Sequence, residues 1–162
     1  QTGKGFRVFV DYAHTPHSLK SVYQALLSEM PARSAHSKLI CVLGAAGGNR
    51  DKWKRPEFGK IAGEYCHEIL LTNEDPYDEN PAAILNEIEA GFSKAPSTKS
   101  KAQNLRKILD RREAIKTALD LAGENDIVVK TGKGSERSMH IAGGRTISWS
   151  DAEVARQLLR DT

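Results

Sequence analysis

Apolar and polar positions follow two alternating patterns along the chain. Short apolar runs, rich in β-branched residues, occupy residues 6–10, 39–43, 68–72, 105–109 and 126–131, and segments with apolar residues at helical spacing separate them. Strands and helices that alternate in this way predict an α/β fold, with a Rossmann-like, mostly parallel sheet of about six strands flanked by helices. For residues 105–109 a helix is the alternative.

Cap and turn residues mark where the elements begin and end. Gly143-Gly144 separates residues 139–142 from residues 145–148 and predicts a C-terminal β-hairpin. Gly123 is expected to end the helix that precedes residues 126–131. The polar residues 94–103 are expected to form an exposed loop, and a helix is expected from about residue 56. The predicted helix N-termini are Thr15-Pro16, Asn80-Pro81, Asp110 with Glu113, and Ser150 with Glu153.

Composition restricts the classes of function. The chain has 162 residues, of which 39% are hydrophobic and 28% charged, as is usual for one soluble domain. A net charge of +3 and 6% aromatic residues do not favour a nucleic-acid partner. No apolar run approaches the ~20 residues of a membrane span, and no signal peptide opens the chain. We therefore expect a cytoplasmic protein without a membrane partner.

Two further expectations concern the cysteines and the start of the chain. Cys41 lies in an apolar run and Cys66 on the apolar side of a helical segment, so we expect two buried free thiols and not a disulfide. Residues 6–10 are already strand-like. This abrupt start indicates a domain cut from a longer protein.

Most of the unusual chemistry follows directly after the predicted strands. In parallel sheets ligands bind at the carboxyl ends of the strands, so these loops are expected to form one composite site. The loop at residues 44–56 combines glycines with basic side chains, which suits phosphate or carboxylate. It has neither the Walker A pattern nor the dinucleotide fingerprint, and a flexible basic loop is the alternative.

The loop at residues 131–137 also fails the Walker A pattern, because Gly134 follows the lysine. A Gly-x-Gly turn there would present Lys133, Ser135 and Glu136 to a ligand. A tight turn before the hairpin is the alternative.

Two other loops carry candidate groups for binding. Asp11 suits a ribose hydroxyl pair or a cation, and His14 suits a phosphate or proton transfer. Arg111 and Arg112 begin a helix where cations are unfavourable, so one of them could serve an anionic ligand. Helix capping is the alternative for both loops. The other histidines, expected at the surface or in polar packing because they lack metal-ligand spacing, are His17, His36, His67 and His140.

Four motifs in this order resemble those of the Mur ligase family. They are DYAHTP at 11–16, GG-x-RDKWKRP at 47–56, the Asp75-Pro76 loop, and GKG-x-E at 132–136. Each motif alone is weak, but the four in order are specific. The chain resembles the C-terminal domain of the family over about residues 6–159, and is most similar to the MurE type, the UDP-N-acetylmuramoyl-tripeptide synthetases.

The resemblance implies one part of a three-domain ATP-dependent ligase of peptidoglycan synthesis. Such enzymes phosphorylate the carboxylate of UDP-MurNAc-dipeptide, and the amine of a third amino acid attacks the acyl phosphate. A first domain holds the UDP-sugar, and a second carries the P-loop and most ligands of Mg²⁺. The third, which residues 1–162 resemble, closes over ATP and holds the incoming amino acid. The resemblance therefore implies ATP, Mg²⁺, both substrates and the two absent domains as partners, and an isolated chain without activity.

The resemblance also assigns roles to residues, with no certain catalytic residue and no metal ligand in this domain. Ser135 replaces the histidine that is usual in the last motif. Implied nucleotide-binding residues are Asp11, His14, Asn49, Arg50 and Lys52. Implied amino-acid-binding residues are Arg55, as a carboxylate clamp, and Glu74, Asp75, Tyr77, Gly132 and Glu136.

The acidic loop departs from the family pattern. Members that add meso-diaminopimelate typically have D-N-P-R where this chain has Glu74-Asp75-Pro76-Tyr77. The arginine that would hold a second carboxylate is missing, and acids stand nearby. This favours lysine or ornithine over diaminopimelate. The alternatives are a folylpolyglutamate or cyanophycin synthetase, which share DYxHxP, and a non-catalytic nucleotide-binding module.

Overall fold

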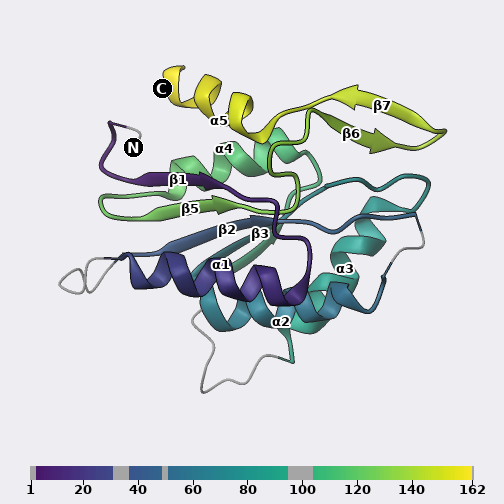
Figure 1. The fold of residues 1–162 in the computed structure, drawn as a ribbon, viewed down its shortest axis with the longest axis horizontal. Helices are drawn as coiled ribbons and strands as arrows, with labels where there is room; N and C mark the ends of the chain where they lie inside the picture. Colours follow the sequence, from purple (N-terminus) through teal and green to yellow (C-terminus); the bar gives the residue numbers. More distant parts are fainter. Residues whose placement is uncertain (1–2, 31–36, 49–50, 95–103, 162) are drawn as a thin grey trace.

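The chain folds into one parallel sheet with helices on both faces and a separate hairpin (Figure 1). A computed structural model describes residues 3–30, 37–48, 51–94 and 104–161. Its elements are β1 (Arg7–Val10), α1 (Pro16–Ser28), β2 (Leu39–Leu43), α2 (Lys54–Tyr65), β3 (Glu68–Leu71), α3 (Pro81–Phe92), β4 (Asn104–Lys107), α4 (Arg111–Leu121), β5 (Ile127–Lys130), β6 (Ser138–Ile141), β7 (Arg145–Ser148) and α5 (Asp151–Arg160).

The sheet confirms the predicted fold class. Its order is β1-β5-β2-β3-β4, and all neighbouring strands are parallel. It has five strands, where about six were expected, and the antiparallel pair β6–β7 forms the predicted hairpin. Residues 104–107 form a strand and not the alternative helix. The polar loop predicted at residues 94–103 lies almost wholly outside the described residues.

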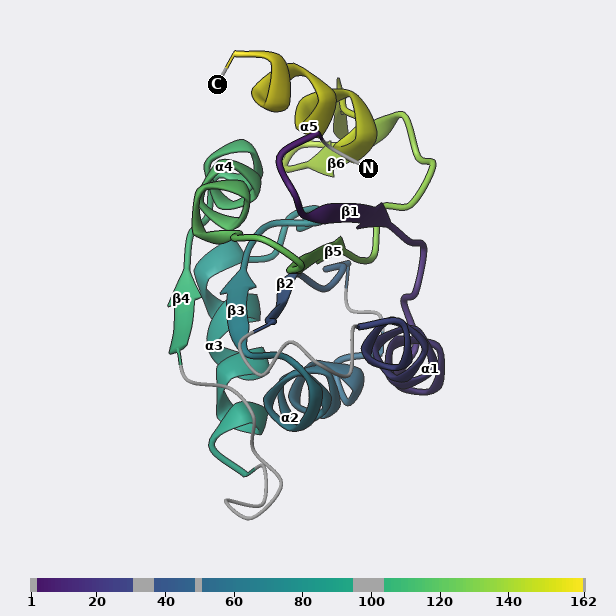
Figure 2. The ribbon, with the colours of Figure 1, turned by 90° about the vertical axis from the view of Figure 1, so that its left-hand side faces the viewer.

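Two hydrophobic clusters cover the two faces of the sheet. Side chains of α1, α2 and α3 pack on one face with alternate residues of β2, β3 and β5, while α4 and α5 cover the other face. Figure 2 shows this arrangement along the sheet edge. Because strand side chains point alternately to the two faces, β2 is buried on both sides, which explains its continuous apolar run.

The predicted helix caps are present. The side-chain oxygens of Thr15, Asn80, Asp110 and Ser150 each accept a backbone N–H of the following helix. Helix α2 begins at Lys54, before the expected residue 56. Helix α4 ends at Leu121, before Gly123, because the chain turns there and the Gly123 N–H donates to the Asp126 carboxylate.

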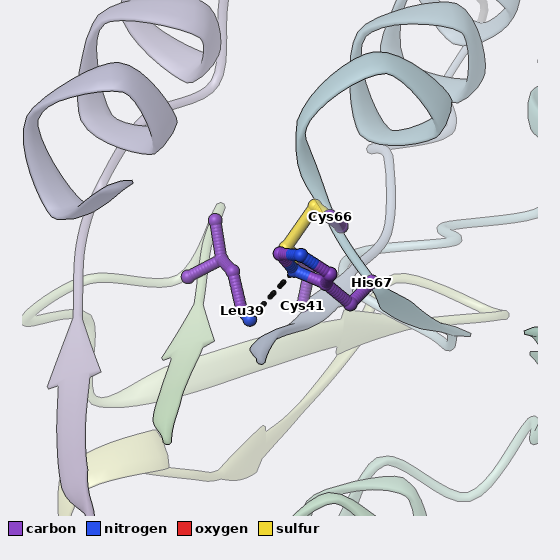
Figure 3. The surroundings of a disulfide bond; sticks show 4 residues. All are labelled: Leu39, Cys41, Cys66 and His67. Atoms are coloured by element: carbon purple, nitrogen blue, oxygen red, sulfur yellow. Dashed lines mark hydrogen bonds between the residues drawn. A yellow bond between two sulfur atoms is a disulfide. The ribbon is translucent and has the colours of Figure 1, made fainter. Parts of the chain in front are cut away.

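The expectation of two free thiols is wrong, because Cys41 and Cys66 form a disulfide (Figure 3). Cys41 lies in β2, and Cys66 caps α2 just before β3. Because β2 and β3 are neighbours in the sheet, the residues that lead into β3 lie next to β2. The Cα atoms of Cys41 and Cys66 are therefore 6.1 Å apart. His67 lies beside the bridge and accepts the Leu39 N–H at 2.9 Å, which is polar packing as expected.

Candidate functional site

A cavity of about 320 Å³ lies at the carboxyl ends of the central strands. The loops after β1, β2, β3 and β5 line it together with the hairpin. The structure therefore brings together side chains that are far apart in the sequence. All six residues assigned to amino-acid binding line the cavity: Arg55, Glu74, Asp75, Tyr77, Gly132 and Glu136.

Glu74 is a buried carboxylate in the wall of this cavity. The described residues donate no hydrogen bond to its carboxylate. Burial raises its pKa to about 7, Arg111 opposes this rise, and the negative charge of Asp75 adds to it. Gly132 lies against the carboxylate, and a Cβ atom at this position would overlap it. A glycine is therefore required beside Glu74.

Asp75 is the centre of a charged cluster below the cavity. Its carboxylate accepts two hydrogen bonds from the Lys133 ammonium, at 2.8 and 2.9 Å, and one from the backbone N–H of His140 at 2.8 Å. Lys133 also contacts the Glu136 carboxylate at 2.6 Å. Burial alone would lower the pKa of Lys133, but Asp75 and Glu136 raise it.

The Gly-x-Gly turn therefore does not present Lys133 to a ligand, as the sequence suggested. Lys133 is fully buried and organises two carboxylates, while Glu136 lines the cavity and Ser135 is exposed. A lysine in a polar loop gives no sequence signal for such burial. Its partner Asp75 is 58 positions away in the chain.

The hairpin docks on the acidic loop through Tyr77 and His140. Their rings are stacked, with centroids 4.9 Å apart and planes inclined by 17°. The carboxylate of Asp78 accepts the Gly143 N–H at 2.7 Å at the tip of the hairpin. His140 also lines the cavity, so its assignment to the surface or to polar packing missed a residue of the site. The place of His140 in the site is seen only in the tertiary structure, where its ring lies opposite the ring of Tyr77.

Arg55 lies at the other side of the cavity and is already occupied by protein groups. Its Nη1 donates to Glu79 at 3.0 Å and Glu87 at 2.8 Å, and its Nη2 donates to Glu79 and to the Ala46 carbonyl, both at 3.1 Å. Burial alone would lower its pKa, but the two glutamates raise it. The guanidinium thus connects the glycine-rich loop, the acidic loop and α3. Only its Nε–H has no partner among the described residues.

The loop after β1 contributes Tyr12 and His14 to the cavity. Their rings lie 4.6 Å apart, and the His14 Nδ1 is 3.1 Å from the Tyr12 carbonyl oxygen. Asp11 does not line the cavity. Its Oδ1 accepts the Ala13 N–H at 2.8 Å, which shapes the loop. Among the implied nucleotide-binding residues that the structure describes, Asp11, His14 and Lys52, it is His14 that lines the cavity with the amino-acid set.

Lys52 is the other implied nucleotide-binding residue within the described ranges. Lys52 is half-exposed and pairs with Glu79 at 3.4 Å, outside the cavity lining. Asn49 and Arg50 lie outside the described residues. Across the ranges that are described, no group of three or more histidine, cysteine or acidic residues is arranged to hold a metal ion.

Arg111 supports the site from behind, where protein groups occupy its guanidinium. It is buried and pairs with both carboxylate oxygens of Asp151, at 2.8 and 2.6 Å. It also donates to the carbonyls of Asn73 at 2.9 Å and Thr131 at 3.1 Å. These carbonyls begin the acidic loop and the Gly-x-Gly loop, so Arg111 fixes both. Arg112 donates to Gln157 on α5.

Negative charge dominates the end of the cavity near the hairpin. Glu74, Asp75 and Glu136 contribute carboxylates there, and Lys133 is the buried cation that contacts two of them. The Tyr77 and His140 rings complete the wall. Such a pocket suits a ligand group with positive charge.

An α/β domain with a polar cavity at the carboxyl ends of its parallel strands has the usual layout of a ligand-binding domain. The chain belongs to the Mur ligase family: residues 1–134 match the family described as "Mur ligase, glutamate ligase domain". The sequence resemblance to this family is thereby confirmed.

Similar proteins identify the branch of the family. A UDP-N-acetylmuramoyl-L-alanyl-D-glutamate–2,6-diaminopimelate ligase from Caldanaerobacter subterraneus is 37% identical over 162 residues, covering 100% of this chain and 31% of that protein. A UDP-N-acetylmuramyl-tripeptide synthetase from Treponema denticola is 39% identical, over 97% of this chain and 28% of its own length. The chain thus spans less than a third of these relatives.

The fold comparison leads to the same branch. A solved structure of a UDP-N-acetylmuramoyl-L-alanyl-D-glutamate–2,6-diaminopimelate ligase superposes with a TM-score of 0.82 and 30% sequence identity, over 97% of this chain and 30% of that one. Within the described ranges, none of the helices has the length and apolar character needed to cross a membrane.

Proposed function

We propose that this chain is the C-terminal, amino-acid-holding domain of an ATP-dependent ligase that adds the third amino acid to UDP-MurNAc-dipeptide. The amine of that amino acid attacks an acyl phosphate on the dipeptide, an amide bond forms, and phosphate leaves. The observation that carries the proposal is the cavity at the strand ends, where all six residues assigned to amino-acid binding meet. The family and the named relatives support the reaction class.

The other substrates belong to the proposed whole enzyme. UDP-sugar-binding and P-loop domains would precede this chain in the polypeptide, and Mg²⁺ would be held mainly there. ATP would approach the loop after β1, where His14 lines the cavity beside Tyr12. Asn49, Arg50 and Lys52 remain candidates for nucleotide contact, as does Asp11 through its second carboxylate oxygen. A UDP-linked substrate and ATP place the reaction in the cytoplasm.

The amino acid that this cavity favours has a side chain ending in an ammonium group, such as lysine or ornithine. Glu74, Asp75 and Glu136 would surround the ammonium. Tyr77 brings no positive charge to the position where diaminopimelate ligases of this family typically have arginine. Diaminopimelate is the second candidate, because several relatives are named as diaminopimelate ligases.

Arg55 has a different role in this proposal from a free carboxylate clamp. Its Nη atoms are filled by Glu79, Glu87 and the Ala46 carbonyl. A substrate carboxylate could bind through the Nε–H, which has no partner among the described residues, or by exchange with one of these Nη partners. Its first role is to hold the three segments around the cavity in place.

The test is an amino-acid panel on the full-length enzyme. Phosphate release is measured with UDP-MurNAc-dipeptide, ATP and each of lysine, ornithine and meso-diaminopimelate at saturating dipeptide. We expect lysine or ornithine to give the highest kcat/KM. A higher kcat/KM for diaminopimelate would refute the ammonium preference, and phosphate release without any amide product would refute the ligase function. The 162-residue chain alone is expected to release no phosphate.

A further inference from the structure

Tyr77 has a backbone conformation that large side chains rarely adopt. Its φ is +50°, in the left-handed region. Such a conformation is strained for a residue with a large side chain, and it persists only where its surroundings hold it. The described contacts that hold Tyr77 come from His140, whose carbonyl accepts the Tyr77 N–H at 3.4 Å and whose ring stacks on the tyrosine ring.

His140 is itself fixed to the same loop. Its backbone N–H donates to Oδ1 of Asp75 at 2.8 Å, and its Nδ1 lies 3.6 Å from the same oxygen. Asp75 is anchored in turn by the buried Lys133. The histidine ring therefore has a defined position between the hairpin and the acidic loop, although its side chain is 43% exposed. Tyr77 and His140 both line the cavity.

We propose that His140 is a positioning residue that sets the amino-acid specificity of this cavity through Tyr77. The inference rests on the ligase function proposed above. Neither the family match nor the names of the relatives assigns a role to this position, which lies after residue 134, where the match to the family ends.

The physical argument follows from the stack. His140 covers one face of the Tyr77 ring, so other positions of the ring would lose the stacking contact, and the ring is held in the cavity wall at its acidic end. An aromatic ring attracts a cation and offers no charge to an anion. The carboxylates of Asp75 and Glu136 share the single ammonium of Lys133, so this end of the cavity keeps a net negative charge that repels an anion. The wall therefore accepts a side-chain ammonium and disfavours the second carboxylate of diaminopimelate.

The test compares kcat/KM for lysine and meso-diaminopimelate in the full-length enzyme and five variants. His140→Leu removes the stack, and His140→Phe keeps an aromatic ring. Thr146→Leu is the matched control, because Thr146 is the exposed cross-strand neighbour of His140 in the same hairpin. Tyr77→Leu alone, and combined with His140→Leu, completes a double-mutant cycle.

We expect His140→Leu to reduce the preference for lysine roughly tenfold, as loss of an aromatic contact to a cation would. His140→Phe and Thr146→Leu should stay within about twofold of the unaltered enzyme. The double variant should be no less selective than Tyr77→Leu, because His140 acts through Tyr77. An unchanged preference in His140→Leu, equal losses in the Leu and Phe variants, or additive effects in the cycle would each overturn the proposal.

A second measurement needs no ligase activity. In the 162-residue chain, the ring proton resonances of Tyr77 are followed by NMR. They should lie away from random-coil positions, shift toward them in His140→Leu, and stay in place in His140→Phe. If the Tyr77 ring resonances were unaffected by His140→Leu, the proposal that His140 positions the Tyr77 ring would be refuted. Absence of amide product from the full-length enzyme would refute only the ligase function.

Discussion

The carboxylate of Glu74 lies where any side chain on Gly132 would have to be. Gly132 also has a φ of +97°, which favours glycine. Two elements that are distant in the sequence therefore meet at a position that tolerates only a hydrogen atom. Both residues line the cavity, so a substitution of Gly132, the first glycine of the GKG turn, tests this contact directly.

Gly132→Ala should destabilise the chain by about 2–4 kcal/mol, because it adds backbone strain and displaces Glu74. Urea denaturation followed by circular dichroism measures the loss. Gly143→Ala is the control, since Gly143 has a φ of +74° with nothing within 4 Å of the added Cβ atom. Equal losses in the two variants would mean that strain alone matters and that Glu74 is not in the way.

Glu74→Gln should stabilise the chain in a pH-dependent way. Burial raises the pKa of Glu74 from 4.5 to about 7, so the folded state binds the proton more tightly than the unfolded state. The stability of the unaltered chain therefore falls as pH rises from 4.5 to 7, by at most on the order of 3 kcal/mol from this group. The advantage of the glutamine variant should grow over that window. The raised pKa of Glu74 would be contradicted if the stability gained by Glu74→Gln did not change with pH. It would also be contradicted if Glu124→Gln, at an exposed position, gained as much stability.

Asp151→Asn should be among the most damaging single changes, at about 3–5 kcal/mol, because it leaves the buried Arg111 guanidinium without its counter-charge. Burial alone would raise the pKa of Asp151, but Arg111 and Trp149 hold it below the usual value. Denaturant titration gives the change in the free energy of unfolding. The control is Asp120→Asn, which breaks an exposed pair with Lys116 and should have no measurable effect. Similar effects at both sites would rule out a supporting role for the buried pair.

Lys130→Met should stabilise the chain at pH 7. The lysine is fully buried on the α4 and α5 face, and its ammonium donates to the Asp151 carbonyl at 2.9 Å. Burial lowers its pKa from 10.5 to about 8, so its charged form weakens the fold below pH 8. The gain should be on the order of 2 kcal/mol at pH 7 and disappear between pH 8 and 10.5. Thermal unfolding of Lys130→Met from pH 7 to pH 10.5 measures this gain in stability, and Lys20→Met, at an exposed position, is the control. A loss of stability at pH 7 would show that the hydrogen bond outweighs burial.

The Cys41–Cys66 bridge predicts that the unfolded chain has no reactive thiol until a reductant is added. Thiol titration in denaturant, before and after reduction, measures this directly. Replacing both cysteines by alanine should lower the free energy of unfolding by about 3 kcal/mol, the entropy of closing a loop of this length. Two free thiols in the purified, unreduced chain would contradict the bridge.

The residues that form secondary structure could be predicted because the signals are local. A strand that is buried on both faces of a sheet needs a continuous apolar run, which residues 39–43 show. A capping oxygen lies within three residues of the backbone N–H that it accepts, as in Thr15 and Asp110. The parallel order of strands and the position of the cavity then follow from chain connectivity. That is why six assigned site residues lie in one cavity.

The partners of those residues could not be predicted in this way. Arg55 is expected to clamp a substrate carboxylate, and no local signal in the sequence indicates that the fold also places Glu79 and Glu87 on its guanidinium. Lys133 was expected to face a ligand, but it is buried between Asp75 and Glu136. The pairs of Arg55 with Glu79 and of Lys133 with Asp75 join residues 24 and 58 positions apart, which no local pattern encodes.

The fold class, the caps and the loops that carry the site follow from the amino-acid sequence, since hydrophobic periodicity and capping act over a few residues. Three-dimensional packing is needed to bring Cys66 to Cys41, to hold the loops from behind through Arg111, and to stack His140 on Tyr77. The reason is physical: burial, charge pairing and stacking depend on which surfaces the packed sheet brings together, and long-range packing sets those contacts.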